Sequence, residues 1–446
     1  MNKVYNTVWN ESIGMWVVTS ELTRKGGQRP RQIRRTVLAG LVAGLLLPSA
    51  PTLATAWDSV TLGSGGTSGS MTLNAGDTAN NTTINSGGQQ YVSSGGSATS
   101  TTINSGGEQY VSNGGSATST TINSGGWQYV SSGGSATSTT INSGGRLSVF
   151  NGSAVDITQN SGGAISTDTS SDLSGANAKG SFSIAGGSAN NMLLENGGYL
   201  VVLDGHQASD TTVGSNGTLG VVSGGSATST TINSGGWQYV SSGGSATSTT
   251  INSGGQLSVF GGSAVDITQN SGGAIATDTS SDLSGTNAKG SFSIAGGSAN
   301  NMLLENGGYL VVLDGHQASD TTVGSYGTLD VVSGGSATST TINSGGWQYV
   351  SSGGSATSTT INGGRQDVFS GGSATSTTIN GGLQVVSSGG SATSTTINSD
   401  GWQDVNDGGS ATSTTINSGG GQAVNSGGSA TSTTINSGGW QYVSSG

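Results

Sequence analysis

Apolar and polar positions alternate in a four-residue segment that returns along most of this chain. The segment reads Trp-Gln-Tyr-Val at 127–130, Glu-Gln-Tyr-Val at 108–111 and Arg-Gln-Asp-Val at 365–368. Its second position holds Gln or a large apolar residue and its fourth mostly Val, whereas the first and third change freely. Because side chains alternate between the two faces of a strand, we expect the second and fourth positions to face a core and the others to face outward.

A second pattern, Ser-Ala-Thr-Ser-Thr-Thr-Ile, follows each of these tetrads, and Ser-Gly-Gly or Asn-Ser-Gly-Gly separates the two. Glycine pairs at this frequency are incompatible with helices, whereas short runs of Thr, Ile, Val and Tyr between glycine turns are typical of strands. Ile84, Ile103, Ile122 and Ile141 are expected to form a core ladder in this second segment. Each unit therefore predicts one coil of a parallel β-solenoid.

The second tetrad position marks the coils, at spacings of 19 or 18 residues and once per long block 17. The series runs Gln90, Gln109, Gln128, Leu147, Ile165, Phe182, Leu200, Leu219, Gln238, Leu257, Ile275, Phe292, Leu310, Leu329, Gln348, Gln366, Gln384, Gln403, Gln422, Gln441. It predicts about twenty coils, and at ~4.8 Å per coil a rod of roughly 100 Å. Stacked Gln side chains are expected to hydrogen-bond from coil to coil as an amide ladder.

A longer repeat is superimposed on the coils. Residues 114–222 and 224–332 match at an offset of 110 residues with six differences. The differing pairs are Arg146/Gln256, Asn151/Gly261, Ser166/Ala276, Ala176/Thr286, Asn216/Tyr326 and Gly220/Asp330. We interpret this as a duplication of about six coils.

The N-terminus has the pattern of an export signal. Four arginines lie between positions 29 and 35, and an apolar run at 37–47 follows them. That run is too short to span a bilayer, which takes about 20 residues, although a short membrane anchor is the alternative. The small-x-small sequence Ala54-Thr55-Ala56 then predicts cleavage between Ala56 and Trp57. We therefore expect a cleaved signal at 1–56 and a solenoid at 57–446.

Composition narrows the function classes. The chain has 83 glycines and no cysteine, which excludes disulfides and thiolate metal sites. Residues 57–446 hold four basic residues against twenty acidic ones, a net charge of −16. That balance excludes a nucleic-acid interface, which needs a basic surface. The glycine repeats also lack the Asp of calcium-binding nonapeptides, so we expect no metal and no cofactor.

The only histidines, His206 and His316, lie in two copies of Leu-Asp-Gly-His-Gln-Ala-Ser-Asp. With Asp204 and Asp210, His206 offers a general base or a metal ligand, the basis of an alternative function as a secreted β-helix enzyme acting on polysaccharides. We favour a solvated turn and no enzyme activity, because a duplicated loop is a weak sign of catalysis. Outward threonine rows also leave open an ice-binding solenoid.

The sequence resembles the self-associating autotransporter adhesins of enteric bacteria, the family of TibA, AIDA-I and antigen 43. The resemblance rests on the segment before the basic run, which begins MNKVYNTVWN and is similar to the extended signal peptide of type V secreted proteins. It rests also on SATSTTIN and on GSFSIAGGSANNMLLENGGYLVVLDGHQASDTTV. It implies a right-handed parallel β-helix passenger, secreted through the inner membrane and displayed at the outer membrane. There it would mediate adhesion to host cells, autoaggregation through other copies of itself, and biofilm formation.

The resemblance also implies O-heptosylation by a dedicated bacterial heptosyltransferase. The matching acceptors are the serines of the Gly-Gly-Ser turns, with turn serines such as Ser94 and Ser132 as competitors. These acceptors are Ser97, Ser116, Ser135, Ser226, Ser245, Ser336, Ser355, Ser373, Ser391, Ser410 and Ser429. Members of the family end in a translocator barrel built of amphipathic strands of about ten residues. We expect no such barrel in this sequence, whose last residues are Ser445 and Gly446.

Overall fold

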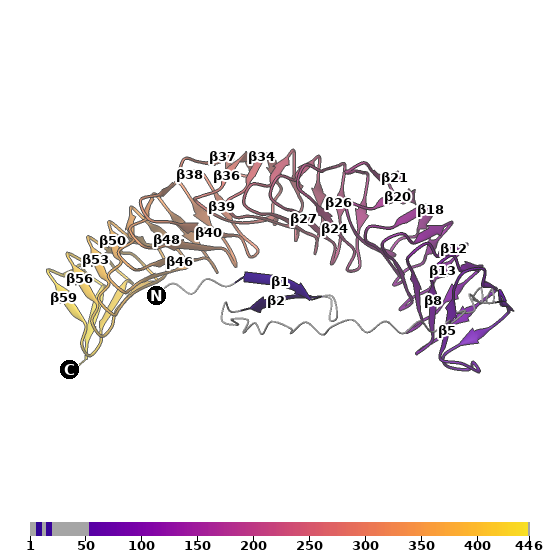
Figure 1. The fold of residues 1–446 in the computed structure, drawn as a ribbon. Helices are drawn as coiled ribbons and strands as arrows, with labels where there is room; N and C mark the ends of the chain where they lie inside the picture. The colour runs from indigo at the N-terminus through magenta and orange to yellow at the C-terminus, as the bar shows by residue number, and fades with distance from the viewer. Residues whose placement is uncertain (1–5, 11–14, 20–52, 445–446) are drawn as a thin grey trace, which may run out of the picture. The chain divides into compact units, whose positions relative to one another are not determined.

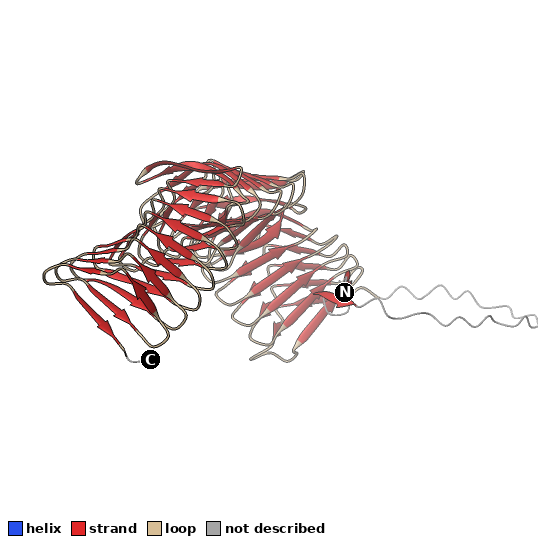
Figure 2. Ribbon diagram, turned by 90° about the vertical axis from the view of Figure 1, so that its left-hand side faces the viewer, coloured by secondary structure: helices blue, strands red, loops and turns tan. Residues whose placement is uncertain are grey.

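The computed structural model describes residues 6–10, 15–19 and 53–444, which form strands joined by turns (Figures 1 and 2). The chain divides into two units, 1–52 and 53–446. In the first unit, β1 (Asn6–Asn10) pairs antiparallel with β2 (Met15–Thr19). Among the described residues, no helix is long and apolar enough to cross a membrane.

One coil of the second unit consists of three short strands. In a representative coil these are β8 (Gln89–Val92), β9 (Ser97–Thr99) and β10 (Thr102–Ile103). Each strand pairs in parallel with its counterpart one coil later, so that Gln90 lies opposite Gln109. The coils follow one another in chain order (Figure 1). The chain is thus an all-β parallel solenoid of about twenty turns with a repeat of 18–19 residues, as predicted.

The tetrads form one continuous parallel sheet, here called the tetrad sheet. Its strands are β5 (Ser70–Leu73), β8, β11 (Glu108–Val111), β14 (Trp127–Val130), β17 (Arg146–Val149), β19 (Ala164–Asp168), β24 (Tyr199–Val202), β27 (Thr218–Val221), β30 (Trp237–Val240), β33 (Gln256–Val259), β35 (Ala274–Asp278), β40 (Tyr309–Val312), β43 (Thr328–Val331), β46 (Trp347–Val350), β49 (Arg365–Val368), β52 (Gly382–Val386), β55 (Gly401–Val405), β58 (Gly421–Val424) and β61 (Trp440–Val443).

The Ser-Ala-Thr segments form a second row of parallel strands. These are β3 (Ala56–Asp58), β6 (Thr78–Asn80), β9, β12 (Ser116–Thr118), β15 (Ser135–Thr137), β22 (Ser188–Asn190), β25 (Gln207–Ser209), β28 (Ser226–Thr228), β31 (Ser245–Thr247), β38 (Ser298–Asn300), β41 (Gln317–Ser319), β44 (Ser336–Thr338), β47 (Ser355–Thr357), β50 (Ser373–Thr375), β53 (Ser391–Thr393), β56 (Ser410–Thr412) and β59 (Ser429–Thr431).

The Thr-Ile segments form a third row, separated from the second by two residues, a corner residue and the threonine that follows it. Its strands are β4 (Thr61–Leu62), β7 (Thr83–Ile84), β10, β13 (Thr121–Ile122), β16 (Thr140–Ile141), β23 (Leu193–Leu194), β26 (Thr212–Val213), β29 (Thr231–Ile232), β32 (Thr250–Ile251), β39 (Leu303–Leu304), β42 (Thr322–Val323), β45 (Thr341–Asn343), β48 (Thr360–Asn362), β51 (Thr378–Ile379), β54 (Thr396–Ile397), β57 (Thr415–Ile416) and β60 (Thr434–Ile435). The longer strands β18 (Ser153–Gln159) and β34 (Ser263–Gln269) pass through both rows without a break.

The expectation that Phe182 and Phe292 each mark a coil is wrong. Phe182 lies in β21 (Gly180–Ala185), which pairs antiparallel with β20 (Asp172–Asn177) and with β22. Strand β19 pairs directly with β24, with Thr167 opposite Leu200. Strands β36 (Asp282–Asn287) and β37 (Gly290–Ala295) repeat this excursion around Phe292. Each duplicate therefore contributes five tetrad strands and one antiparallel excursion, not six coils.

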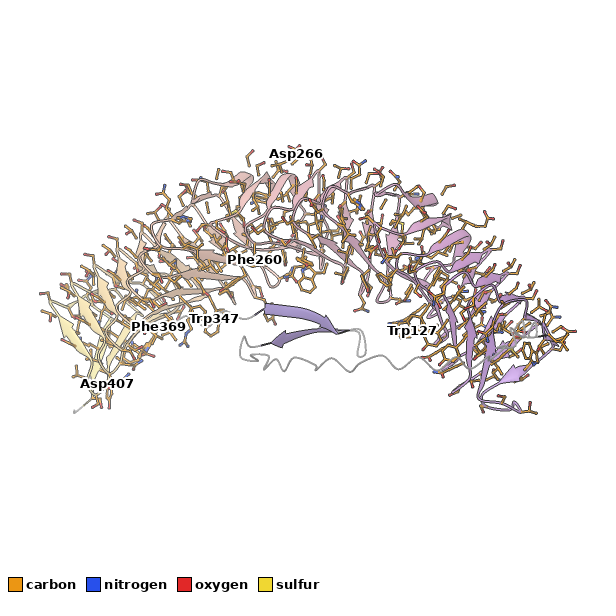
Figure 3. All side chains as sticks on the ribbon, viewed as in Figure 1. Trp127, Phe260, Asp266, Trp347, Phe369 and Asp407 are labelled. Atoms are coloured by element: carbon orange, nitrogen blue, oxygen red, sulfur yellow. The ribbon has the colours of Figure 1, made fainter. Side chains whose placement is uncertain are left out.

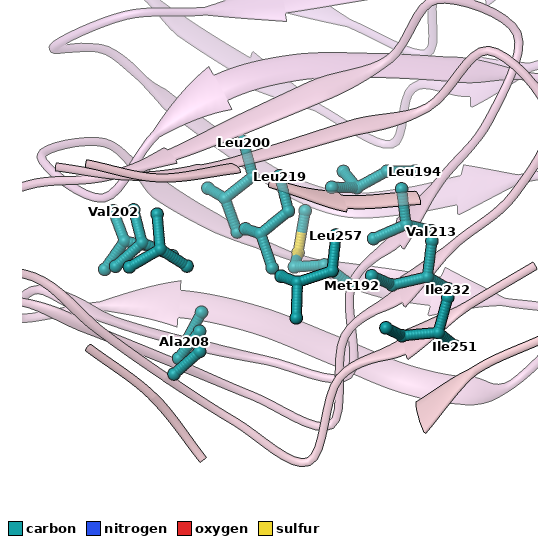
Figure 4. Packing of buried hydrophobic residues seen from close by; sticks show 14 of the residues in the cluster. Met192, Leu194, Leu200, Val202, Ala208, Val213, Leu219, Ile232, Ile251 and Leu257 are labelled. Carbon is teal, nitrogen blue, oxygen red and sulfur yellow. The ribbon is translucent and has the colours of Figure 1, made fainter. Parts of the chain in front are cut away.

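The core is built from ladders of identical side chains. Val92, Val111, Ile84 and Ile103 are fully or almost fully buried, as the alternation predicts. Figure 4 shows the apolar middle of the solenoid, where Leu200, Leu219 and Leu257 take the marker position beside Val213, Ile232 and Ile251. Each such side chain contributes ~1.5–3 kcal/mol when buried, and burial requires a neighbouring coil on each side. Stacking of coils therefore provides most of the stability.

The predicted amide ladder is confirmed. Gln109 donates its Nε2 to Gln90 Oε1 at 2.8 Å, and the same bond continues from Gln348 through Gln366 to Gln441. The expectation of outward threonine rows is wrong for one row. Thr101 is 1% exposed. Its hydroxyl accepts a hydrogen bond from Gln109 Nε2 at 3.2 Å and donates one to Gln90 Oε1 at 3.4 Å. Buried Thr hydroxyls therefore satisfy the glutamine amides that an apolar core could not.

Two backbone positions explain why glycine, and serine, asparagine or aspartate, recur at particular positions of the repeat. A Cβ on Gly115 would lie 2.1 Å from the carbonyl oxygen of Val92 in the previous coil, so only glycine allows the coils to approach. The corner residue between the second and third rows has positive φ, 55° at Ser100 and 57° at Ser119. Asn81 and Asp210 take the same position, in keeping with the left-handed conformation that Asn and Asp tolerate best.

Candidate interaction surface

The outer face of the tetrad sheet carries stacked aromatic rings. Tyr91 and Tyr110 have ring centroids 5.1 Å apart, and Tyr110 and Tyr129 4.9 Å, with planes within 9° and 2° of parallel. This stack follows directly from the register, which places Tyr opposite Tyr in three successive coils. Figure 3 shows Trp127, Phe260 and Trp347 along this side of the solenoid and Asp266 on the other.

Packing within the stack changes the acidity of two hydroxyls, those of Tyr110 and Tyr129. Tyr110 donates to Glu108 Oε2 at 2.7 Å. Burial, and next this hydrogen bond to a carboxylate, raise the pKa of Tyr110 well above its ordinary value of 10. Burial also raises the pKa of Tyr129 to about 12. The sequence predicted Trp127 and Tyr129 as surface residues; they lie on the outer face but half-bury each other, with ring centroids 4.4 Å apart.

The predicted glycosylation serines all lie at one position of the coil, the first residue of a second-row strand and not within the turn itself. Ser116 illustrates the position: it is half-buried, and its N–H donates to Gly96 O at 3.0 Å in the previous coil. Of the eleven, Ser429 is exposed and the others are half-buried. The competing turn serines Ser94 and Ser132 are exposed.

A more exposed set of serines, not predicted from the sequence, lies at the corners between the second and third rows. All are exposed and have positive φ. They are Ser100, Ser119, Ser138, Ser229, Ser248, Ser339, Ser358, Ser376, Ser394, Ser413 and Ser432. The exchange of Ser with Asn and Asp at this slot was the available signal, because these residues are favoured where φ is positive.

The two histidines have a structural environment. His206 is half-buried, with Nδ1 2.8 Å from Thr169 Oγ1, and its ring lies against Gly187. His316 repeats this contact with Thr279 at 2.9 Å. The sequence predicts that each histidine lies in a solvated turn. Instead, each histidine joins the returning coil to the preceding excursion. Within the described ranges, no three His, Cys, Asp or Glu side chains come together as a metal site.

The predicted cleavage site borders the first coil. Ala56 begins β3, and the N–H of Thr55 donates to Asp77 Oδ1 at 2.7 Å. That bond and one from Asn74 lower the pKa of Asp77, the Asn74 bond being the larger cause. Cleavage between Ala56 and Trp57 remains a prediction. The basic and apolar runs of the export signal lie outside the described residues.

Two family models match this chain. The model described as adhesin of bacterial autotransporter system, probable stalk, matches residues 58–107, 103–145, 174–236, 284–346, 325–364 and 380–420. The model of the extended signal peptide of the type V secretion system matches residues 1–50. Together they cover more than half of the chain, including many of the repeats and the N-terminal segment that precedes them.

Two curated relatives and one solved structure are similar to parts of the chain. Autotransporter CRAC of Citrobacter rodentium (strain ICC168) is 70% identical over 209 residues, 47% of this chain and 13% of that protein. Autotransporter adhesin/invasin TibA of Escherichia coli O78:H11 is 66% identical over 92 residues, 21% of this chain and 9% of that protein. The chain therefore spans a small part of both relatives. The crystal structure of a TibC-catalyzed hyper-glycosylated TibA fragment is 41% identical; the alignment covers 88% of this chain and 97% of that one, with a TM-score of 0.23.

Proposed function

Because this chain belongs to the family of bacterial autotransporter adhesin stalks, we propose that it mediates adhesion to host cells, autoaggregation and biofilm formation as a surface-displayed rod. Its first 50 residues match the extended signal peptide of type V secretion, so it is an exported protein directed to the cell surface. The matching family model and the relative TibA are both described as adhesins, which favours adhesion over the polysaccharide-acting alternative.

The observation that carries the proposal is the register of the outer polar rows. Thr99, Thr118 and Thr137 lie opposite one another in successive coils, and all three are half-buried on the outer face. A row of this kind presents the same hydroxyl once per coil, about every 4.8 Å. Each hydrogen bond between two rods contributes only ~0.5–1.5 kcal/mol net. Repetition along the rod makes the sum sufficient for association, as in other multivalent contacts.

The proposal includes O-heptosylation of the second-row serines by a dedicated bacterial heptosyltransferase. Ser97, Ser116 and Ser135 stack in register at the start of β9, β12 and β15, so one enzyme would meet the same local backbone in each coil. All three serines are half-buried, so part of each residue remains exposed to solvent. The relationship to TibA, a fragment of which is described as hyper-glycosylated, supports this reading.

Display on cells tests the adhesive function. Bacteria that carry the chain on a translocator should clump and settle, and should bind cultured epithelial cells. Changing Thr99, Thr118 and Thr137 to Glu adds charge to one polar row of an already acidic rod, so settling should slow severalfold. The control places three Glu at the turn serines Ser94, Ser132 and Ser242, away from that row. Equal settling of both variants and the parent would contradict association through the row.

A further inference from the structure

Five tryptophans occupy the first tetrad position of the tetrad sheet, and three of them begin a Trp-Gln-Tyr-Val strand that is followed by a further coil. Trp127, Trp237 and Trp347 each begin a Trp-Gln-Tyr-Val strand, β14, β30 and β46. The residue that lies directly opposite each of them in the next coil differs. It is Arg146 for Trp127, Gln256 for Trp237 and Arg365 for Trp347.

In two of the three positions the chain covers the indole with its own guanidinium group. The Cζ of Arg146 lies 5.8 Å from the ring centroid of Trp127, and that of Arg365 lies 5.1 Å from the ring centroid of Trp347. Both distances are within the range at which a cation is attracted to the face of an aromatic ring. The same backbone position therefore accepts an arginine side chain twice within one molecule.

The middle position has the same ring without the cation. Gln256 replaces the arginine, and Trp237 is 47% exposed, compared with 38% for Trp347. Its indole is nevertheless fixed, because Nε1 donates to Ser258 Oγ at 2.9 Å, as Trp127 donates to Ser148. Tyr239 and Phe260 beside it are also exposed, at 40% and 43%. The indole thus makes the same hydrogen bond as in the first copy, but within the described part of the chain no arginine lies over its ring.

We propose that Trp237 is an acceptor site for an arginine side chain of a basic partner polypeptide. The occupant is inferred from the two equivalent positions, where a guanidinium group already sits. The charge of residues 57–446, −16 with only four basic residues, favours a basic partner over a second copy of this chain. A planar guanidinium stacks on an indole better than an ammonium group does, so arginine is preferred to lysine. This proposal goes beyond the adhesive function and does not depend on it.

Titration of the full chain with N-acetyl-arginine methylamide tests the site. The indole N–H resonance of Trp237, assigned with a Trp237→Phe variant, should shift progressively at millimolar concentrations, because a single cation–π contact is weak. The corresponding citrulline amide is neutral and nearly the same shape, and should cause little shift. Equal shifts with both compounds would mean that no cation is recognised, and would overturn the proposal.

Exchanging the two duplicate residues provides matched controls. Gln256→Arg gives the second copy the residue of the first, and Arg146→Gln does the reverse, so both variants keep a side chain that the same fold already accepts. Gln256→Arg should reduce the ligand-induced shift of Trp237 about fivefold or more, because the site is then occupied internally. Arg146→Gln should give Trp127 a shift comparable to that of Trp237. Unchanged responses in both variants would show that the arginines do not control access to the rings, and would overturn the proposal.

Discussion

Gln128 donates its Nε2 to Oε1 of Gln109 at 2.7 Å, although the two residues are 19 positions apart and both are 0% exposed. The bond joins two coils through the core. Each glutamine also exchanges hydrogen bonds with buried threonines; Thr120 Oγ1, for example, accepts from Gln128 Nε2 at 3.2 Å. Where leucine takes the marker position these bonds are missing, and the hydroxyls of Thr211, Thr230 and Thr321 have no partner among the described residues.

Gln109→Leu should lower stability by about 2–3 kcal/mol, because it removes the middle bonds of the ladder and leaves buried amide and hydroxyl groups unpaired. Gln238→Leu should be neutral or stabilising by up to about 1 kcal/mol. Gln238 lies between Leu219 and Leu257, and its Nε2 has no partner within the described part of the chain. Urea unfolding, together with hydrogen exchange of β11 and β30, measures the stability change in both variants. Hydrogen exchange is needed because a solenoid need not unfold in one step. Equal losses in the two variants would contradict the ladder's contribution.

Gly115→Ala should destabilise the solenoid by about 1–3 kcal/mol, because the new Cβ would overlap the carbonyl oxygen of Val92 at 2.1 Å. Ser119→Asn, four residues further on, should change stability by less than about 0.5 kcal/mol, since Asn tolerates the corner conformation. Thermal unfolding of the two variants compares them directly. A large loss for Ser119→Asn would show that the corner serine hydroxyl has a further structural role.

Burial raises the pKa of Asp330, and the hydrogen bond from Tyr309 at 2.6 Å partly opposes this. A raised folded pKa means that the folded state keeps its proton to higher pH than the unfolded state. That stabilisation is complete below the ordinary value of 3.8 and is lost as pH rises through the folded value. Asp330→Gly, which installs the residue of Gly220 in the first copy, should flatten the dependence of unfolding free energy on pH from about pH 4 upward. Tyr309→Phe should raise the Asp330 pKa further, as carboxyl NMR would show.

Tyr110 and Tyr129 should lose their hydroxyl protons at a higher pH than an ordinary tyrosine. Glu108→Gln should bring the pKa of Tyr110 down towards, but not to, its ordinary value, because burial remains the larger cause. Tyr129 should follow to a smaller extent, since Glu108 also contributes to its raised pKa. Tyrosinate absorbance at 295 nm measures the change, and Asp77→Asn provides a control distant from the stack. An unchanged titration curve would mean that Glu108 does not affect the hydroxyl.

Glycosylation should follow coil position. In a strain that produces the heptosyltransferase, Ser116→Ala should remove one sugar from the intact mass, whereas Ser119→Ala should remove none. The two serines lie in one coil, so the comparison controls for expression and folding. Peptide mapping that finds sugar at the corner serine and none at the second-row serine would replace the predicted set with the corner set.

Repetition made most of the fold predictable. Because residues at one repeat position meet their own kind in the next coil, the alternation in a single tetrad placed Gln109 and Val111 inward and Trp127 outward. The Phe182 excursion was not predictable in this way. Its length keeps the coil spacing nearly unchanged, while its two halves pair locally and antiparallel, so spacing alone does not distinguish it from a coil.

The sequence by itself determined the coil, the stacking register and the inward ladder, because these depend on short-range alternation and on a period that every coil shares. Only the tertiary structure decided which threonines are buried, which serines are most exposed and which tryptophans lie under an arginine. Those properties depend on contacts between residues 8 to 21 positions apart, as in Gln109 with Thr101 and Trp127 with Ser148. Such contacts are set by where the turns place each coil on the next, and the identity of one residue does not specify them.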